Sequence, residues 1–172
     1  MNLKNIQFKV KKNTNLDNSD KKFLFETFRM LFNKKYGYDL IDEYFKTDCD
    51  NTFSLTLKNV KNNNDLICIY DNDILKGGAI VNYISKNEID LLDIAIDGYT
   101  EEEKREVWKL TVDFALKYFK KLGYKKIYLE IPVKDPFLLV RANDLGFKED
   151  DTLDISYDET IIYLYSKELN NE

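Results

Sequence analysis

The sequence predicts a single α/β domain, and three observations support this. The chain has 172 residues, of which 44% are apolar and 33% charged, as in ordinary globular domains. Short apolar runs with the period of strands alternate with longer segments of helical period. The run 88–97 leads through a glycine turn into one long helix and then into a second apolar strand. One domain over residues 1–172 accounts for the whole pattern.

Charge and hydropathy narrow the classes of partner. Lysine and arginine number 26 against 31 acids, a net charge of −5, and the basic residues are scattered along the chain. A phosphate backbone would find no continuous patch, so we expect no nucleic-acid partner. No window approaches the ~20 apolar residues that span a bilayer, and the first ten residues lack the apolar run of a signal peptide. The sequence therefore predicts a cytoplasmic protein with no membrane partner.

The side chains available for chemistry are few. Cys49 and Cys68 are the two cysteines, no CxxC motif occurs, and the chain contains no histidine. The usual zinc ligands are therefore missing, and we expect no metal site and reduced thiols. The absence of histidine also removes the usual general base near neutral pH. Acid–base chemistry would have to use carboxylates, tyrosines, cysteines, lysines or water.

The first 65 residues predict four elements. Apolar residues alternate with polar ones in the strand 7–12. A helix follows, capped by Ser19 or Asp20 and stopped at Gly37, because its apolar residues recur at helical spacing. The pattern then predicts a short helix over 39–46 and an extra strand over 53–57.

A hairpin and a long strand follow. The runs 66–70 and 74–84 are joined by Asp71, Asn72 and Asp73, residues that tolerate tight turns, so they predict a hairpin. The pair Gly77 and Gly78 marks a kink or a close backbone approach. In the strand 88–97 the alternation slips phase between Leu91 and Leu92. Either a β-bulge corrects it or the strand is buried on both faces.

The long helix spans about 100–122 and begins with a capping box. The Thr100 oxygen accepts from the Glu103 N–H, and Glu103 reaches back to the Thr100 N–H. A strand over 125–132 follows, and then a helix running to Gly146, with Asp135 as its capping acid. The runs 147–156 and 160–166 predict a closing hairpin.

This order of elements resembles that of the GNAT superfamily of acyl-CoA-dependent N-acyltransferases. The resemblance rests on the hairpin 69–78, the segment 116–130 and the run Asn143 to Phe147. It covers residues 66–165, and residues 1–65 match in topology, as the variable acceptor-side part. It implies a mixed central sheet with helices on both faces. The sheet would be splayed between the family's fourth and fifth strands, here 88–97 and 125–132, with the pantetheine arm of acetyl-CoA or another acyl-CoA in the gap.

The resemblance also implies site residues. The backbone of Ile94, Ala95 and Ile96 would face the cofactor, and Asp135, where the family commonly has asparagine, would contact the arm if it is not simply a helix cap. The best-placed general base is Asp90, with Asp93 second. Partial burial would suit either to accept a proton, whereas solvated positions on a polar strand face would not. The acceptor would be a small-molecule or peptide amine. A homodimer is compatible with the sequence.

Two departures separate this chain from the family's pattern. The family's pyrophosphate loop, Gln/Arg-x-x-Gly-x-Gly/Ala, falls between 101 and 108. Its small residues are replaced by Lys104 and Glu106 in one register, or by Glu106 and Trp108 in the other. The capping box partly occupies the N–H donors, and Glu101 and Glu102, in the first turn of the helix, oppose an incoming phosphate. Lys104 and Arg105 would relieve part of this repulsion and are the candidate phosphate contacts.

The second departure concerns the general acid. The family's frequent tyrosine, four residues before the Gly-Phe pair, is Ala142 here, so a proton for the thiolate would come from water or from Tyr163 or Tyr165. Two functions therefore stay open. One is an N-acyltransferase that moves an acyl group from acyl-CoA to an unidentified amine. The alternative is a degenerate, non-catalytic module that binds a small ligand or a protein partner.

Overall fold

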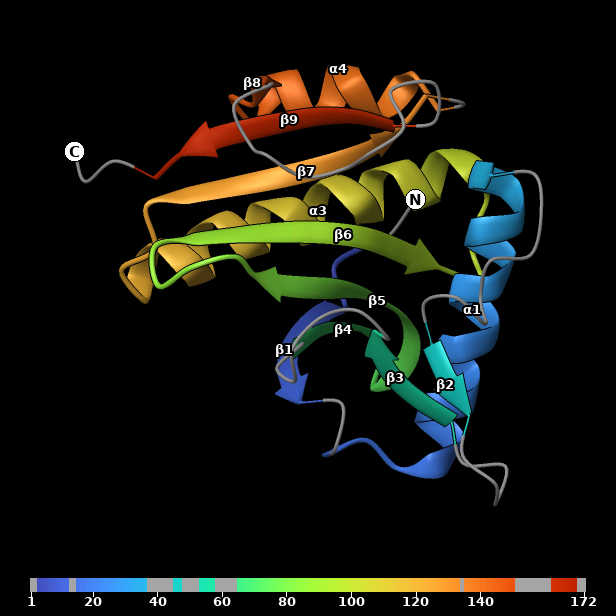
Figure 1. Cartoon of the computed structure of the whole chain (residues 1–172). Helices are drawn as coiled ribbons and strands as arrows, with labels where there is room; N and C mark the ends of the chain where they lie inside the picture. Colours follow the sequence, from blue (N-terminus) through green and yellow to red (C-terminus); the bar gives the residue numbers. More distant parts are fainter. Residues whose placement is uncertain are drawn as a thin grey trace.

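A computed structural model describes residues 3–12, 15–36, 45–47, 53–57, 65–133, 135–150 and 162–169 of this chain. For residues 32–36, 45–47 and 53–57 it describes the backbone alone. The described residues form a seven-stranded mixed sheet with helices on both faces (Figure 1). The predicted α/β architecture is therefore confirmed. Within the described residues, no helix is long and apolar enough to cross a membrane.

The large sheet has the strand order β1-β4-β5-β6-β7-β9-β8. All neighbouring strands are antiparallel except β6 and β7, which are parallel. The strands are β1 (Ile6–Lys12), β4 (Asp65–Asp71), β5 (Ile74–Tyr83), β6 (Glu88–Ile96), β7 (Lys126–Pro132), β8 (Lys148–Glu149) and β9 (Ile162–Glu168).

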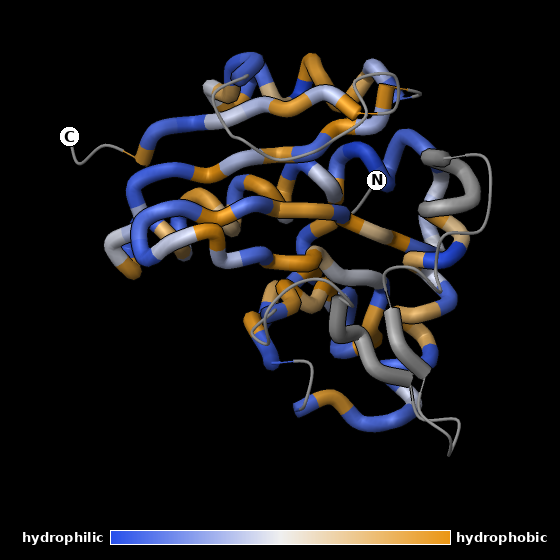
Figure 2. Tube along the Cα trace, in the orientation of Figure 1, coloured by the Kyte–Doolittle hydropathy of each residue, from blue (hydrophilic) through white to orange (hydrophobic). Residues whose placement is uncertain are grey.

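In the described part of the chain, three helices flank this sheet: α1 (Asn18–Tyr36), α3 (Glu101–Lys121) and α4 (Phe137–Asp144). Residues of α3 and α4 contribute to one buried apolar cluster, and residues of α1 to a second cluster on the opposite face. Hydrophobic residues gather along the strands between these helices (Figure 2). A separate two-stranded sheet consists of β2 (Phe45–Thr47) and β3 (Phe53–Leu57).

The N-terminal predictions have mixed outcomes. The strands at 7–12 and 53–57 are confirmed as β1 and β3. Helix α1 begins at Asn18, before both predicted caps, and its first turn is held by Asp17, whose Oδ1 accepts a hydrogen bond from the Asp20 N–H at 2.8 Å. The predicted caps Ser19 and Asp20 are therefore wrong. Residues 45–46 belong to a strand, which contradicts the end of the predicted helix 39–46, and residues 37–44 lie outside the described residues.

The hairpin of β4 and β5 is confirmed. Asn72 and Asp73 have positive φ angles of 48° and 64°, which a tight turn between antiparallel strands requires. Gly77 marks a close backbone approach, because a Cβ at this position would lie 2.1 Å from the Ala95 carbonyl oxygen. This contact brings β5 against β6 near the end of β6.

The phase slip in β6 is a β-bulge. Leu91 pairs with Val81 and Ile94 pairs with Ala79, so two residues of β6 stand opposite Ile80 alone. Ile89 and Leu91 before the bulge, and Ile94 and Ile96 after it, all pack against the cluster that contains α3. The extra residue restores one continuous apolar face. The strand is also buried on its other face, where Ala95 packs with α1.

Helix α3 begins with the predicted capping box. The Glu103 N–H donates to Thr100 Oγ1 at 3.2 Å, and the Thr100 N–H donates to a Glu103 carboxylate oxygen at 3.0 Å. Helix α4 differs from expectation, because its N-cap is Pro136 and no side chain caps it. The predicted capping role of Asp135 is therefore wrong. In the closing hairpin β8 is two residues long, and residues 151–161 lie outside the described part of the chain.

Candidate functional site

The sheet opens between its two parallel strands. β6 and β7 pair from Glu88 and Lys126 to Leu91 and Leu129, and the pairing ends there although both strands continue. β6 stays paired with β5 as far as Ile96, and β7 stays paired with β9 as far as Pro132. The bulge in β6 lies where the two strands part, and bulges bend and twist a strand at such points. The predicted splay is therefore confirmed.

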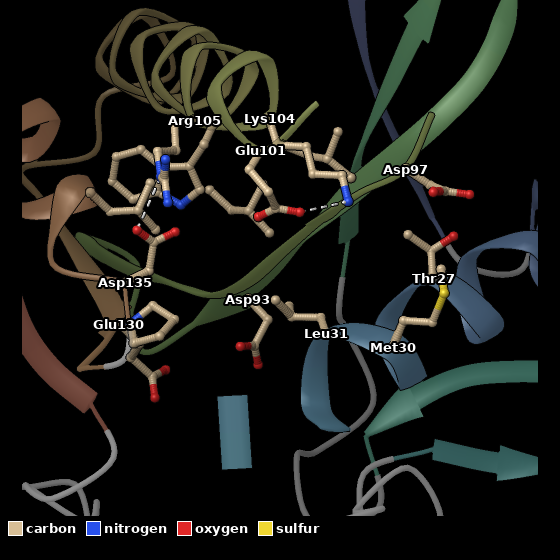
Figure 3. Close-up of a pocket in the computed structure, with 15 residues that line it drawn as sticks. Thr27, Met30, Leu31, Asp93, Asp97, Glu101, Lys104, Arg105, Glu130 and Asp135 are labelled. Atoms are coloured by element: carbon tan, nitrogen blue, oxygen red, sulfur yellow. Dashed lines mark hydrogen bonds and ion pairs between the residues drawn. The ribbon is translucent and has the colours of Figure 1, made fainter. Parts of the chain in front are cut away.

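A cavity of about 200 Å³ lies at this opening. Its described lining comes from α1, the end of β6 and the residue after it, the first turns of α3, the end of β7, and the start of α4 with the residue Asp135 before it. Figure 3 shows their side chains converging on a common space. The cavity therefore brings residues of α1, near the N-terminus, together with residues of α3, β7 and α4 from the second half of the chain.

Apolar side chains form much of the cavity wall. Leu31 comes from α1, Ile94 and Ile96 come from β6, and Trp108 and Leu138 come from α3 and α4. Trp108 is the sole tryptophan of the sequence, and 5% of its surface is exposed. A wall of this kind suits the uncharged, aliphatic part of a ligand, and it places an intrinsic fluorophore at the site.

On the α3 side of the cavity, two cations lie against carboxylates. Lys104 Nζ lies 3.5 Å from Glu101 Oε1, and Arg105 Nε lies 3.2 Å from Asp135 Oδ1 (Figure 3). The Arg105 guanidinium also sits 4.3 Å from the centre of the Phe137 ring. About three-quarters of the Arg105 and Asp135 side chains are buried. Asp135 thus serves as the counter-ion of Arg105 and not as a cap for α4.

On the opposite side, Asp93 and Glu130 contribute two further carboxylates. Asp93 lies in the bulge of β6 and is 7% exposed, and Glu130 lies on β7 across the opening. In Figure 3 both carboxylates point away from Lys104 and Arg105. The sequence prediction missed Glu130. Its signal is an acid inside the apolar strand 126–132, a position that is unfavourable unless the strand borders a polar site.

The described part of the lining is acidic. It contains five carboxylates, from Asp93, Asp97, Glu101, Glu130 and Asp135, and two cations, Lys104 and Arg105, a formal balance of three negative charges among the described residues. A cavity with low-dielectric walls focuses such a field, so it attracts cations and repels anions. The described lining therefore favours a positively charged substrate and disfavours a negatively charged one.

The predicted site residues divide into two groups. The cavity lining includes Asp93, Ile94, Ile96, Lys104, Arg105 and Asp135. Asp90 and Ala95 are not among the described lining residues: Asp90 pairs across the sheet with Asn82 and Tyr128, and Ala95 packs with α1. Asp90 and Asp93 are both buried, so the interpretation of both as solvated residues is wrong. Of the two candidate bases, Asp93 is among the described lining residues and Asp90 is not.

The start of α3 uses its own side chains at the corner where a phosphate would sit. The N–H groups of Thr100 and Glu103 donate within the capping box, and the Lys104 N–H donates to the Thr100 carbonyl at 2.9 Å. Glu106, which stands for a small residue in both registers of the loop, forms an ion pair of 2.7 Å with Arg141. Trp108, the other large replacement, is buried.

The candidates for a general acid lie away from the cavity. Ala142 is fully buried in the apolar cluster beneath α4. Tyr163 and Tyr165 lie on β9, and neither is among the described lining residues. Burial raises the pKa of Tyr165, with Glu149 and Tyr163 adding to the effect. Neither predicted tyrosine therefore belongs to the described lining.

Comparison with known proteins identifies the fold. An acetyltransferase of the GNAT family from Staphylococcus aureus Mu50 superposes with a TM-score of 0.62 at 16% identity, covering 95% of this chain and 100% of that one. The aminoglycoside 6'-N-acetyltransferase of Enterococcus faecium gives a TM-score of 0.60 at 13% identity, with 95% and 98% covered. This chain has the GNAT fold. The PaiA N-acetyltransferase of Thermoplasma acidophilum, whose structure is a complex with coenzyme A, gives a TM-score of 0.58 at 16% identity, with 94% and 99% covered.

Sequence comparison adds no closer relationship. No protein-family model matches the chain, and no curated protein sequence matches it. The likeness therefore lies in the GNAT fold.

The cavity suits one part of acyl-CoA better than the other. Its apolar wall and the parted edges of β6 and β7 suit a narrow, uncharged arm, because the edges of parted strands offer backbone groups for hydrogen bonds. The acidic start of α3 suits a diphosphate poorly, because its cations already lie against carboxylates and two of its amides are capped.

Proposed function

We propose that this protein is an N-acyltransferase that moves an acetyl or other acyl group from a coenzyme A thioester to an amine. The observation that carries the proposal is the parting of β6 from β7 around a cavity of about 200 Å³ within a GNAT fold. The thioester would supply an activated acyl carbon. The residues of this chain would hold the arm, admit the amine and accept its proton.

The end of β6 would position the reacting groups. The amine nitrogen attacks the thioester carbonyl carbon, the C–S bond breaks, and the sulfur leaves as a thiolate that takes a proton from water. The amine loses its extra proton before attack and a second proton after it. Asp93, buried and facing the cavity, is the acceptor that the geometry favours, directly or through water. Glu130, across the opening, would hold the incoming ammonium beside it.

The acidic lining supports a cationic acceptor. An amine is protonated at neutral pH, so the excess of carboxylates would draw it into the cavity. The name of the Enterococcus faecium neighbour gives an aminoglycoside as its substrate, an amine-bearing small molecule. We propose a small-molecule amine as the acceptor here as well.

Two measurements test this function. Calorimetric titration with acetyl-CoA, followed in parallel by Trp108 fluorescence, should show saturable binding, because the tryptophan lines the cavity. A panel of small amines should then release free thiol in the presence of acetyl-CoA. Failure to bind acetyl-CoA or a shorter pantetheine thioester at millimolar concentration would contradict the proposal.

The second candidate is a non-catalytic module with the same fold. The capping box at Thr100 and the alanine at 142 favour it, because both remove features that catalysis in this fold commonly uses. Such a module would bind an amine or a protein partner without turnover. Release of thiol in the presence of any amine, lost in the variant Asp93→Asn, would eliminate this alternative.

A further inference from the structure

The start of α3 is occupied by its own side chains, whereas β6 and β7 part beside an apolar cavity. From this contrast we infer that the acyl donor is recognised through its thioester and uncharged pantetheine arm, and that the nucleotide diphosphate adds little to binding. The inference rests on the proposed function, and it names the class of donor that the same cavity takes: a pantetheine thioester.

The capping box is the first step of the argument. Phosphate binding at a helix start depends on backbone N–H groups that point outward without partners. Here the Thr100 and Glu103 N–H groups already donate to side chains, at 3.0 and 3.2 Å. A diphosphate would have to break this reciprocal pair before those amides could bind it, which cancels much of what the new bonds would contribute.

The charges around the same turn are the second step. Residues 101–103 are all glutamates, and their carboxylates lie in the first turn of α3. The neighbouring cations do not compensate, since Lys104 lies against Glu101 and Arg105 lies against Asp135. Arg105 is held from two sides, by the Asp135 carboxylate and by the Phe137 ring. An incoming phosphate would compete with Asp135 for Arg105 and would still meet the glutamates.

The cavity wall is the third step. Leu31, Ile94, Ile96 and Trp108 give the opening an apolar surface that needs no charge on its ligand. This surface lies directly beside the parted edges of β6 and β7. The arm can therefore bind here without help from a diphosphate at the start of α3.

Two sources share the chemistry of a pantetheine thioester. One is a free, small thioester, and the other is a phosphopantetheine arm attached to a carrier protein. The structure assigns the shared arm, and the binding experiment can separate the sources.

The experiment compares ligands that differ in what is attached to one arm. Trp108 fluorescence and calorimetry would give dissociation constants for pantetheine, 4'-phosphopantetheine and coenzyme A. We expect the three values to agree within about threefold, which corresponds to well under 1.4 kcal/mol. Coenzyme A binding tenfold or more tightly than pantetheine would overturn the inference while leaving the proposed function intact, whereas absence of binding by all three would overturn both.

A carrier protein bearing the same arm forms the fourth ligand. Tighter binding of the carrier-borne arm than of free 4'-phosphopantetheine would assign the source to a carrier. Equal or weaker binding would assign it to a free thioester. Both results agree with recognition through the arm.

A variant tests the competition at Arg105. Asp135→Asn removes the counter-ion and keeps the side-chain shape, so coenzyme A should bind about three- to tenfold more tightly while the affinity for pantetheine stays unchanged. The matched control is Asp144→Asn, because Asp144 also pairs with a cation, Lys109 at 3.5 Å, but is not among the described lining residues. An equal gain for pantetheine, or no gain for coenzyme A, would show that Asp135 does not compete with phosphate.

Discussion

The capping box at the start of α3 makes a quantitative prediction about stability. Replacing Thr100 by alanine removes the oxygen that accepts from the Glu103 N–H, and replacing Glu103 by alanine removes the reciprocal bond to the Thr100 N–H. Loss of an N-cap side chain costs about 1 kcal/mol in the free energy of unfolding. Glu103→Ala should cost a similar amount, about 0.5–1.5 kcal/mol, from the second hydrogen bond and from the loss of a charge that the helix dipole stabilises.

A matched variant separates these two contributions. Glu102 lies in the same first turn and is more exposed, but its side chain is not part of the capping box. Glu102→Ala therefore removes a dipole-stabilised charge alone, worth about 0.3–1 kcal/mol. The capping contribution of Glu103 is the difference between the two variants.

The assay is urea denaturation followed by circular dichroism. With a slope of about 2 kcal/mol per molar urea, Thr100→Ala should lower the midpoint by about 0.5 M and leave the slope unchanged. The double variant of Thr100 and Glu103 should cost less than the sum of the single ones, because the two bonds support one geometry. If Glu103→Ala is no more destabilising than Glu102→Ala, the reciprocal bond does not contribute to stability and the reasoning is wrong.

Three further predictions concern packing, chemistry and pH. Gly77→Ala should destabilise the fold by at least about 2 kcal/mol in urea, because its Cβ would meet a backbone oxygen at 2.1 Å. Gly78→Ala in the same strand should cost less, because its Cβ would meet Leu24 Cδ2 at 3.3 Å and the Ile67 carbonyl oxygen at 3.4 Å; equal costs would contradict the close approach. In steady-state kinetics, Asp93→Asn should lower kcat about a hundredfold or more, because Asp93 is proposed to accept the proton of the amine. Glu130→Gln should mainly raise the KM for the amine. The reverse pattern would make Glu130 the proton acceptor and Asp93 the residue that holds the amine. Burial raises the pKa of Cys68 from 9.0 to about 11, so the thiol ionises at a lower pH in the unfolded chain than in the folded protein. The free energy of unfolding should therefore fall between pH 9 and 11, and it should fall by more in the unmodified protein than in Cys68→Ala. Parallel pH profiles of the two proteins would contradict this.

Local rules in the sequence determine the features that were predicted correctly. The capping box follows from a threonine and a glutamate three residues apart, and the hairpin follows from three turn residues between two apolar runs. The bulge in β6 could be predicted because a side-chain period of two shows any slip at once. Each of these signals lies within about ten residues of sequence, so no tertiary information is needed.

Features that depend on tertiary contacts were missed. Asp135 stands where a helix cap is expected, but it lies against Arg105, thirty residues earlier in the chain. Glu130 faces the cavity because β7 parts from β6, and the sequence of one strand does not show where its neighbour ends. Ala95, by contrast, is turned toward α1 by the bulge, which also fixes that Ile94 and Ile96 line the cavity.

The most direct measurement of how the donor is held is the change in backbone amide chemical shifts when coenzyme A is added to the labelled protein. If the donor is held through its arm, the amides of 94–96 should shift strongly and those of 101–107 should shift little. Large shifts confined to 102–107, which would place the diphosphate against the start of α3, would contradict the inference that the diphosphate adds little to binding.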